Sequence, residues 1–148
     1  MNTYNSRFKY KAWDKNAKRM WEVTEINWRS TEQGGEIFYI RGNTEYNGHK
    51  NAPIGGHKDF CDRFDDIILL EFTGLCDKHD REIYAGYIIE DRWGKKYLVE
   101  WSNERSGWVP FANGTGCGCC EVDMVYNSGD VEVNGNRFEN PELLEEVK

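Results

Sequence analysis

The sequence predicts a mainly β protein, and three of its features support this prediction. Short apolar segments recur along the chain with Gly, Asn and Asp clustered between them, as in sandwiches and small barrels. Within several segments apolar and polar residues alternate with a period of two, which is typical of half-buried strands. The 148 residues are 39% hydrophobic and 14% aromatic, so the chain can bury a core that depends on Trp, Tyr and Phe.

The N-terminal segment predicts a β-hairpin. In RFKYKAW (residues 7–13) aromatic or small residues alternate with lysines, and DKNAK (14–18) supplies turn residues. RMWEVTEINW (19–28) then has the β-branched and aromatic character of a second strand. The alternation predicts that most of the rings occupy the core face and the lysines the opposite face.

A long loop follows the hairpin region. A turn at Thr31–Gly35 leads to a short strand, EIFYI (36–40), after which residues 41–66 show no sustained period. Because structureless stretches of this length are uncommon in compact domains, we expect an insertion, a mobile loop or a short helix around Lys58–Arg63. Residues 1–66 therefore form a predicted N-terminal hairpin region and long loop.

Residues 67–148 predict a second β domain. Gly94 and Asn127–Asp130 mark turns, and short strands lie between such turns at regular spacing. The predicted strands are IILLEF (67–72), EIYAGYIIED (82–91), KKYLVEW (95–101), WVPF (108–111), EVDMVY (121–126) and VEV (131–133). Within the third of these, Tyr97, Val99 and Trp101 share one face, which predicts that Trp101 lies in the core.

The chain ends in ENPELLEEVK, which predicts a short C-terminal helix. Asn140 suits the N-cap and Pro141 the first helical position, while Glu142 favours the positive end of the helix dipole. Because so short a helix is unstable alone, its apolar side chains must dock on the sheet. These side chains are Leu143, Leu144 and Val147. Truncation of each buried leucine to alanine should then cost about 2–5 kcal/mol.

An acidic cluster stands between the strands at 67–72 and 82–91. Asp77, His79, Asp80 and Glu82 place oxygen ligands close together, which suits a hard cation, but the longer glycine-centred pattern of a helix-loop-helix calcium site is missing. The same residues are common in chain reversals, where they hydrogen-bond the backbone of the turn. We therefore favour the solvated tip of a β-hairpin over a metal or catalytic site.

The five cysteines are odd in number and irregularly spaced, which predicts free thiols. Cys117, Cys119 and Cys120 could offer thiolates to zinc, yet C-x-C-C lacks the paired spacing of structural zinc sites, and adjacent cysteines point apart in an extended chain. Candidates for a fourth ligand are Cys61, Cys76, His57 and His79. No motif places a histidine (His49, His57 or His79) beside a thiol, so we expect neither a metal cofactor nor catalysis.

Charge is unevenly spread over the chain, whose net charge is -7. Residues 1–60 hold 10 Lys/Arg against 7 Asp/Glu, and residues 61–148 hold 9 against 19. The basic part combines stacking rings with cations, which is the pattern of single-strand nucleic-acid binding. Its cations are Arg7, Lys9, Lys11, Lys15, Lys18, Arg19 and Arg29, and its rings are Phe8, Tyr10, Trp13, Trp21 and Trp28. Because alternation separates the rings from the lysines, nucleic-acid binding is the alternative function rather than the favoured one.

Three segments resemble the YopX family in order and spacing. FKYKAWDKNAKRMWEV (8–23) is similar to the family's opening, ILLEFTGLCDKHDREIYAGYII (68–89) to its central T-G-L-x-D and E-I-Y-x-G signature, and GNRFENPELLEE (135–146) to its ending. The resemblance implies a phage or prophage protein of unassigned activity whose second half is an SH3-like barrel. Tyr87, Asn134 and Arg137 depart from the family pattern, and residues 114–120 lie outside it.

The predicted function is accordingly the non-catalytic binding of another protein, in the cytoplasm of a bacterial host. No segment has the roughly 18 apolar residues of a membrane span, and the N-terminus lacks an apolar signal region. The partner would bind an SH3-like groove, an exposed sheet edge, or an aromatic surface formed by Trp93, Trp101 and Trp108. The identity of that partner and homo-oligomerisation stay open.

Overall fold

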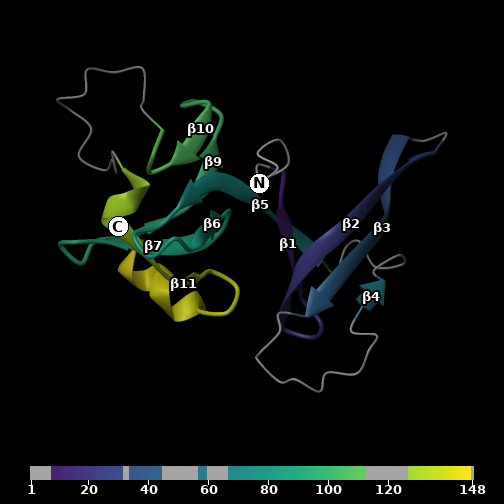
Figure 1. The fold of residues 1–148 in the computed structure, drawn as a ribbon, viewed down its shortest axis with the longest axis horizontal. Coiled ribbons are helices and arrows are strands. Elements are labelled where there is room, and N and C mark those ends of the chain that lie inside the picture. Colours follow the sequence, from purple (N-terminus) through teal and green to yellow (C-terminus); the bar gives the residue numbers. More distant parts are fainter. Residues whose placement is uncertain (1–7, 32–33, 45–56, 60–66, 113–126, 148) are drawn as a thin grey trace. The chain divides into compact units, whose positions relative to one another are not determined.

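The computed structural model describes residues 8–31, 34–44, 57–59, 67–112 and 127–147 (Figure 1). Side chains are described for residues 8–23, 67–112 and 127–147. The chain divides into two compact units, which are treated separately below. The first unit is Lys9–Leu70, and the second is Glu71–Lys148 together with Met1–Phe8. Both are mainly β, as the sequence predicts.

The first unit is built from antiparallel strands. They are β1 (Tyr10–Asp14), β2 (Arg19–Thr31), β3 (Gly34–Thr44), β4 (His57–Asp59) and the first residues of β5 (Ile67–Cys76), in the spatial order β4-β3-β2-β1-β5. The predicted N-terminal hairpin is therefore confirmed, with Ala12 opposite Trp21 and Trp13 opposite Met20. Its turn is fixed by the Asp14 carboxylate, which accepts hydrogen bonds from the amides of Asn16 and Ala17 at 3.0 and 2.9 Å.

Burial in this hairpin departs from the simple alternation. Ala12 and Trp21 lie in a buried cluster with Ile67, and Trp13 and Met20 on the other face are also buried. Because both faces are covered at this point, the period of two no longer separates a core face from a solvent face. Most of the rings were predicted to lie opposite the lysines. Trp13 has the parity of Lys11 within β1 and is buried nonetheless.

The predicted loop at 41–66 is only partly described. Its first residues continue β3 to Thr44, and Lys58 with Asp59 lie in β4, which pairs with β3. The prediction of a short helix around Lys58–Arg63 is therefore wrong for Lys58 and Asp59, and residues 60–63 lie outside the described residues. The physical reason is that the backbone of Lys58 and Asp59 pairs with the edge of β3, a long-range interaction that no local sequence pattern records.

The second unit contains three small antiparallel groups of strands: β5 with β6, β9 with β10, and a three-stranded sheet in the order β11-β7-β8. The bounds are β6 (Glu82–Tyr84), β7 (Tyr87–Asp91), β8 (Lys96–Leu98), β9 (Glu100–Ser102), β10 (Gly107–Val109) and β11 (Val131–Asn136), with the 3-10 segments η2 (Ser128–Asp130) and η3 (Pro141–Glu146). Ile83, Ile88, Ile89, Val99 and Val131 are fully buried and form much of its core. The strand predicted at 121–126 lies outside the described residues.

The prediction for residues 95–101 was wrong for Trp101, which was expected in the core. Tyr97 and Val99 are buried as expected, but Trp101 is 53% exposed. The amide of Val99 donates to Tyr87 O at 2.8 Å and its carbonyl accepts from Gly86 at 2.7 Å, and β8 ends just before it. β9 then pairs with β10 instead of β7, so the alternation of faces does not continue through Val99.

The predicted short C-terminal helix is not confirmed, because Pro141–Glu146 forms only the 3-10 segment η3. Asn140 makes no side-chain capping bond, because its carboxamide oxygen instead accepts from the amide of Asn136 at 3.3 Å. None of the residues of η3 is buried. The segment is held by polar contacts at its end, where Lys96 Nζ lies 2.6 Å from Glu146 Oε2 and 3.2 Å from Glu90 Oε2, and Val147 forms a bridge with Lys96.

Leu143 gives a quantitative check of this shallow docking. If Gly135 had a Cβ, that atom would stand 3.0 Å from Leu143 Cδ1. Leu143 therefore packs on β11 while remaining partly exposed. We expect Leu143→Ala to lower the free energy of unfolding by about 1 kcal/mol, below the 2–5 kcal/mol of a buried leucine. Urea denaturation measures this, with the exposed Glu145→Ala as the control. A loss above about 3 kcal/mol would contradict the shallow docking.

Candidate functional site

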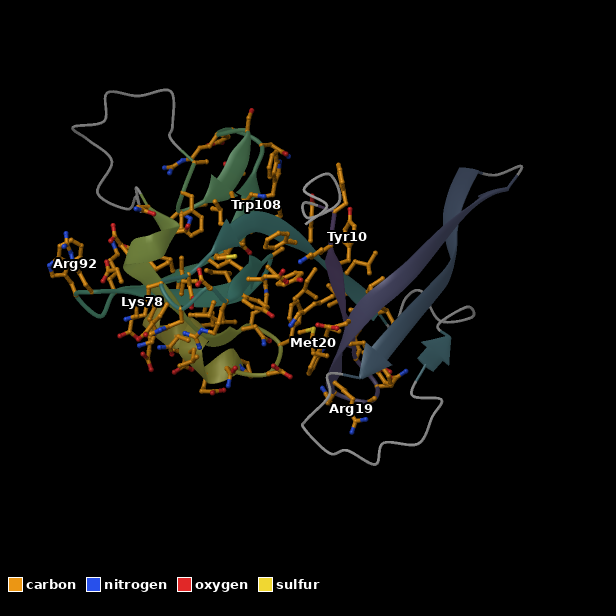
Figure 2. All side chains as sticks on the ribbon, viewed as in Figure 1. Tyr10, Arg19, Met20, Lys78, Arg92 and Trp108 are labelled. Atoms are coloured by element: carbon orange, nitrogen blue, oxygen red, sulfur yellow. The ribbon has the colours of Figure 1, made fainter. Side chains whose placement is uncertain are left out.

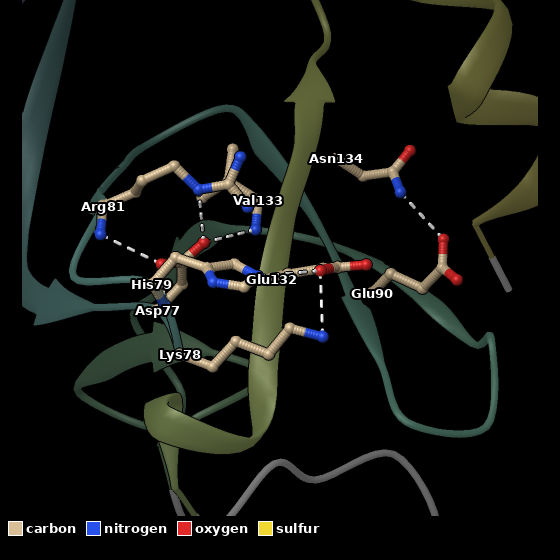
Figure 3. A network of polar contacts seen from close by, with 8 residues as sticks. All are labelled: Asp77, Lys78, His79, Arg81, Glu90, Glu132, Val133 and Asn134. Atoms are coloured by element: carbon tan, nitrogen blue, oxygen red, sulfur yellow. Dashed lines mark hydrogen bonds and ion pairs between the residues drawn. The ribbon is translucent and has the colours of Figure 1, made fainter.

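The acidic cluster lies in the turn between β5 and β6, and Asp77 is its centre (Figure 3). The side chain of Asp77 is fully buried, and its two oxygens accept four hydrogen bonds. One oxygen accepts from the amides of His79 and Arg81 at 2.8 and 2.9 Å. The other accepts from Arg81 Nε at 2.9 Å and from the amide of Val133, on β11, at 2.8 Å. Asp77 thus joins its own turn to a strand 56 residues later.

The electrostatics of Asp77 follow from these contacts. Burial alone would raise the pKa of this carboxyl group, but the amides of Val133, Arg81 and His79 and the Arg81 guanidinium outweigh it and hold the pKa below 3.8. The carboxylate is therefore ionised at neutral pH with its lone pairs engaged by the protein. An oxygen in this state stabilises the fold and is a poor ligand for an added cation.

The other members of the cluster do not converge on Asp77. His79 Nε2 lies 3.4 Å from Glu132 Oε2 on β11, whose carboxylate also pairs with Lys78 Nζ at 2.9 Å. The Lys78 ammonium, more than His79, lowers the pKa of Glu132. Glu82 accepts from the Tyr84 hydroxyl at 2.7 Å, and the side chain of Asp80 is exposed. Over the residues described, no three His, Cys, Asp or Glu side chains are grouped to hold a metal ion.

The predicted hairpin is confirmed by the pairing of its strands, with one correction. β5 pairs with β6 across the acidic cluster, Cys76 standing opposite Glu82. The prediction of a solvated tip holds for His79 and Asp80 but was wrong for Asp77. Its side chain binds β11, which covers the turn, and the amide of Lys78 likewise donates to Val131 O at 2.9 Å.

A pH dependence follows from the lowered pKa of Asp77. Since the folded-state pKa lies below the ordinary value of 3.8, ionised Asp77 stabilises the fold above about pH 4. That contribution is lost as the pH falls below about 4 through the folded-state pKa. We expect the difference in unfolding free energy between wild type and Asp77→Asn to shrink from about pH 6 to about pH 2. Urea titrations of both proteins at each pH measure it, and a difference independent of pH would contradict this role.

The other residues that carry the family resemblance also serve the fold. Thr73 donates its hydroxyl to Ile83 O at 2.8 Å and accepts from the amide of Leu75, and Gly74 has φ +84°, so they shape the irregular pairing of β5 with β6. Gly86 has φ +81°, and a Cβ there would stand 2.9 Å from the Phe138 ring. The central and final motifs are therefore in contact, and their residue types reflect packing.

The ending is organised by Asn136, which is buried. Its Oδ1 accepts from the amides of Phe138 and Glu139 at 3.0 and 2.9 Å, and its Nδ2 donates to Glu139 Oε2 at 2.7 Å. Of the residues that depart from the family pattern, Asn134 donates to Glu90 Oε2 at 2.8 Å and Arg137 pairs with Glu100 at 2.9 Å. Both contacts are exposed and lie on the surface of the second unit.

The cysteine and histidine candidates are mostly outside the described residues. The structure does not describe Cys61, Cys117, Cys119, Cys120 and His49. For His57 it describes the backbone but not the side chain. Cys76 is partly buried and forms no disulfide. The zinc hypothesis therefore stays a hypothesis.

The basic hairpin is described over residues 8–23. Lys15, Lys18 and Arg19 are exposed at its turn, while Trp13 and Trp21 are buried. Phe8 is 75% exposed. A single-strand surface requires rings accessible beside the cations. Neither tryptophan of the described β1–β2 hairpin meets this requirement; the side chain of Trp28 lies outside the described residues.

Trp93 and Trp101 are the exposed tryptophans among the side chains that the structure describes. Trp101, on β9, stands edge-on to Trp108, on β10, with ring centroids 5.3 Å apart and planes at 81°. Trp93 is 76% exposed in the turn between β7 and β8, where the Arg92 guanidinium lies 4.2 Å from its ring centroid. Sequence reasoning named all three tryptophans but missed the exposure of Trp101 and the role of Arg92. The sequence signal for Arg92 was its position next to Trp93, directly before the turn glycine Gly94.

Two solved structures are similar to this chain. A crystal structure of protein EF1440 from Enterococcus faecalis matches with TM-score 0.46 and 21% identity over 92% of this chain and 96% of that one. That of protein yopX from Bacillus subtilis has TM-score 0.43 and 16% identity over 97% and 98% of the two chains. No curated protein matches. None of the helices in the described part of the chain is long and apolar enough to span a bilayer. A model of the YopX protein family matches residues 9–145, and the chain therefore belongs to that family.

Proposed function

We propose that this chain is a non-catalytic accessory protein of a phage or prophage, acting in the bacterial cytoplasm by binding another protein. In this proposal the second unit is an SH3-like barrel, and its exposed tryptophans contact the partner. The observation that carries the proposal is the exposure of Trp93 and Trp101, at 76% and 53%, on a unit whose buried core is formed by other side chains.

Exposed tryptophans at two sites favour a binding function for a physical reason. A Trp side chain in water leaves a large apolar area unburied, and burial against a partner recovers that free energy. Trp is also among the residues most enriched at the energetic centres of protein interfaces. Both side chains are held by local contacts, Trp93 by Arg92 and Trp101 by Asn103, whose Oδ1 accepts from the indole at 3.0 Å.

Binding through side chains is favoured over addition of a strand to the β11-β7-β8 sheet. The outer edge of β11 is engaged by the turn, since Val131 O accepts from the Lys78 amide and the Val133 amide donates to Asp77. At the other edge, Val147 bridges β8 at Lys96. An edge covered in this way offers few unpaired backbone groups to another chain.

Single-strand nucleic-acid binding is the alternative function. The burial of Trp13 and Trp21 beside the exposed cations Lys15, Lys18 and Arg19 removes two of the rings on which bases would stack. The acidic balance of residues 61–148, 9 Lys/Arg against 19 Asp/Glu, disfavours a phosphate chain on the second unit. These observations support protein binding.

Affinity capture from cells that carry the prophage, followed by native mass spectrometry, tests the proposal. Wild-type bait should retain a protein in fixed stoichiometry, and the double variant Trp93→Ala/Trp101→Ala should lose it while keeping its circular dichroism and thermal midpoint. Phe8→Ala is a matched control that also removes an exposed ring. The proposal fails when no stoichiometric protein is retained, or when the double variant retains it as wild type does.

A further inference from the structure

The turn between β7 and β8 is a rigid platform. Asp91 Oδ1 accepts from the amides of Trp93 and Lys95 at 2.8 and 3.0 Å, and Oδ2 accepts from the Tyr97 hydroxyl at 3.1 Å. The backbones of Asp91 and Lys95 also pair at 2.9 Å, and Gly94 has φ +80°, as a short hairpin loop of this kind requires. The side chains at the tip are therefore presented with little freedom left to lose on binding.

Arg92 and Trp93 form a single exposed surface at this tip. The guanidinium lies 4.2 Å from the indole centroid, within the range of a cation–π interaction, and Figure 2 shows Arg92 at the end of the hairpin. Over the residues described, no carboxylate lies within ion-pair distance of Arg92; the nearby Asp91 is engaged by the turn and Glu90 by Lys96 and Asn134. A fixed guanidinium with its donors available is suited to bidentate pairing with a carboxylate.

The surroundings limit which ligand this tip can take. Residues 61–148 carry 9 Lys/Arg against 19 Asp/Glu, so a long polyanion lying along the unit would meet repulsion. Charges separated by more than about 8 Å are largely screened at physiological salt, so one or two carboxylates placed directly at the tip avoid most of that repulsion. Charge complementarity therefore favours a short acidic segment over a nucleic acid.

We propose that the Arg92–Trp93 tip is the anchor for an acidic segment of the protein partner, with Arg92 pairing an Asp or Glu and the Trp93 ring packing on a neighbouring apolar side chain of that segment. This inference rests on the proposed protein-binding function and names its surface and ligand chemistry. Trp101 then contacts the same partner outside that acidic segment.

A photo-crosslinking amino acid placed at position 93 of the full chain, and in a parallel protein at position 101, tests the assignment in cells that carry the prophage. Mass spectrometry then maps the crosslinked residues. We expect position 93 to crosslink a protein within a segment rich in Asp and Glu, and position 101 to crosslink the same protein outside that segment. A crosslink to nucleic acid, to a second copy of this chain, or to a segment without carboxylates overturns the assignment.

Binding of the captured partner to single variants provides the second readout. Trp93→Ala should raise the Kd about 30-fold and Arg92→Glu at least as much, as for residues at the centre of an interface. Arg92→Lys should lie between wild type and Arg92→Glu, since it keeps charge without the planar fork. Phe8→Ala, which also removes an exposed ring, is the matched control and should change Kd less than about 3-fold. If Trp101→Ala abolishes binding and Trp93→Ala does not, protein binding stands and the tip is excluded; if no partner is captured, both proposals fall.

Discussion

Replacement of Asp77 by alanine should lower the free energy of unfolding of the second unit by about 3–5 kcal/mol. The substitution leaves the amides of His79, Arg81 and Val133 without the acceptor that binds all of them. Each buried donor left unsatisfied costs about 1–3 kcal/mol, although the costs are not additive. The ion pair with Arg81 adds little, because that side chain is 49% exposed. Urea denaturation followed by tryptophan fluorescence measures the loss.

Asp80→Asn is the matched control for this prediction. Asp80 lies three residues along the same turn with its side chain exposed and φ +59°, a backbone conformation that asparagine tolerates. We expect its effect to stay within about 0.5 kcal/mol. Equal losses for Asp77→Ala and Asp80→Asn would show that charge in the turn, and not the buried hydrogen bonds to β11, accounts for the stability.

Gly86→Ala should destabilise the second unit by about 2–4 kcal/mol. Two terms contribute. A side chain at φ +81° costs about 1–2 kcal/mol, and the new Cβ would stand 2.9 Å from Phe138 Cε2 and 3.3 Å from Arg137 Cδ. The ring cannot move away freely, because the Arg137 amide donates to Gly86 O at 2.9 Å and holds the two segments together. Chemical denaturation quantifies the effect.

Gly74→Ala separates the two terms. Gly74 has φ +84°, nearly the same backbone, but nothing lies within 4 Å of the position that a Cβ would take there. Its substitution should therefore cost only the backbone term, about 1–2 kcal/mol. If Gly74→Ala proves as costly as Gly86→Ala, the contact between the central and final motifs contributes nothing measurable and the packing explanation of Gly86 is wrong.

The residues behind the family resemblance acquire a physical meaning from these contacts. Asp77 and Gly86, in the central motif, contact β11 and the segment that follows it, and Asn136, in the final motif, fixes the turn after β11. A motif of this kind preserves a fold without prescribing a reaction. Function is therefore better sought in side chains that the fold does not use, such as Arg92 and Trp93.

Local patterns located several of the strands and turns in the described part of the chain. Alternation located the hairpin of β1 and β2, and Gly94 located the turn that ends at β8. They failed where partners are distant in sequence. Residues 58–59 join β3 instead of starting a helix, and η3 is a 3-10 segment because Asn140 accepts from Asn136 instead of capping a helix.

The candidate sites divide in the same way. The sequence by itself determined that residues 77–82 form a polar reversal between two apolar runs, because turn chemistry and alternation are local properties. Only the tertiary structure decided that Asp77 is buried against Val133 and that Trp101 is exposed. Burial depends on which strands cover a residue, and β11 lies about 50 residues beyond the turn that it covers.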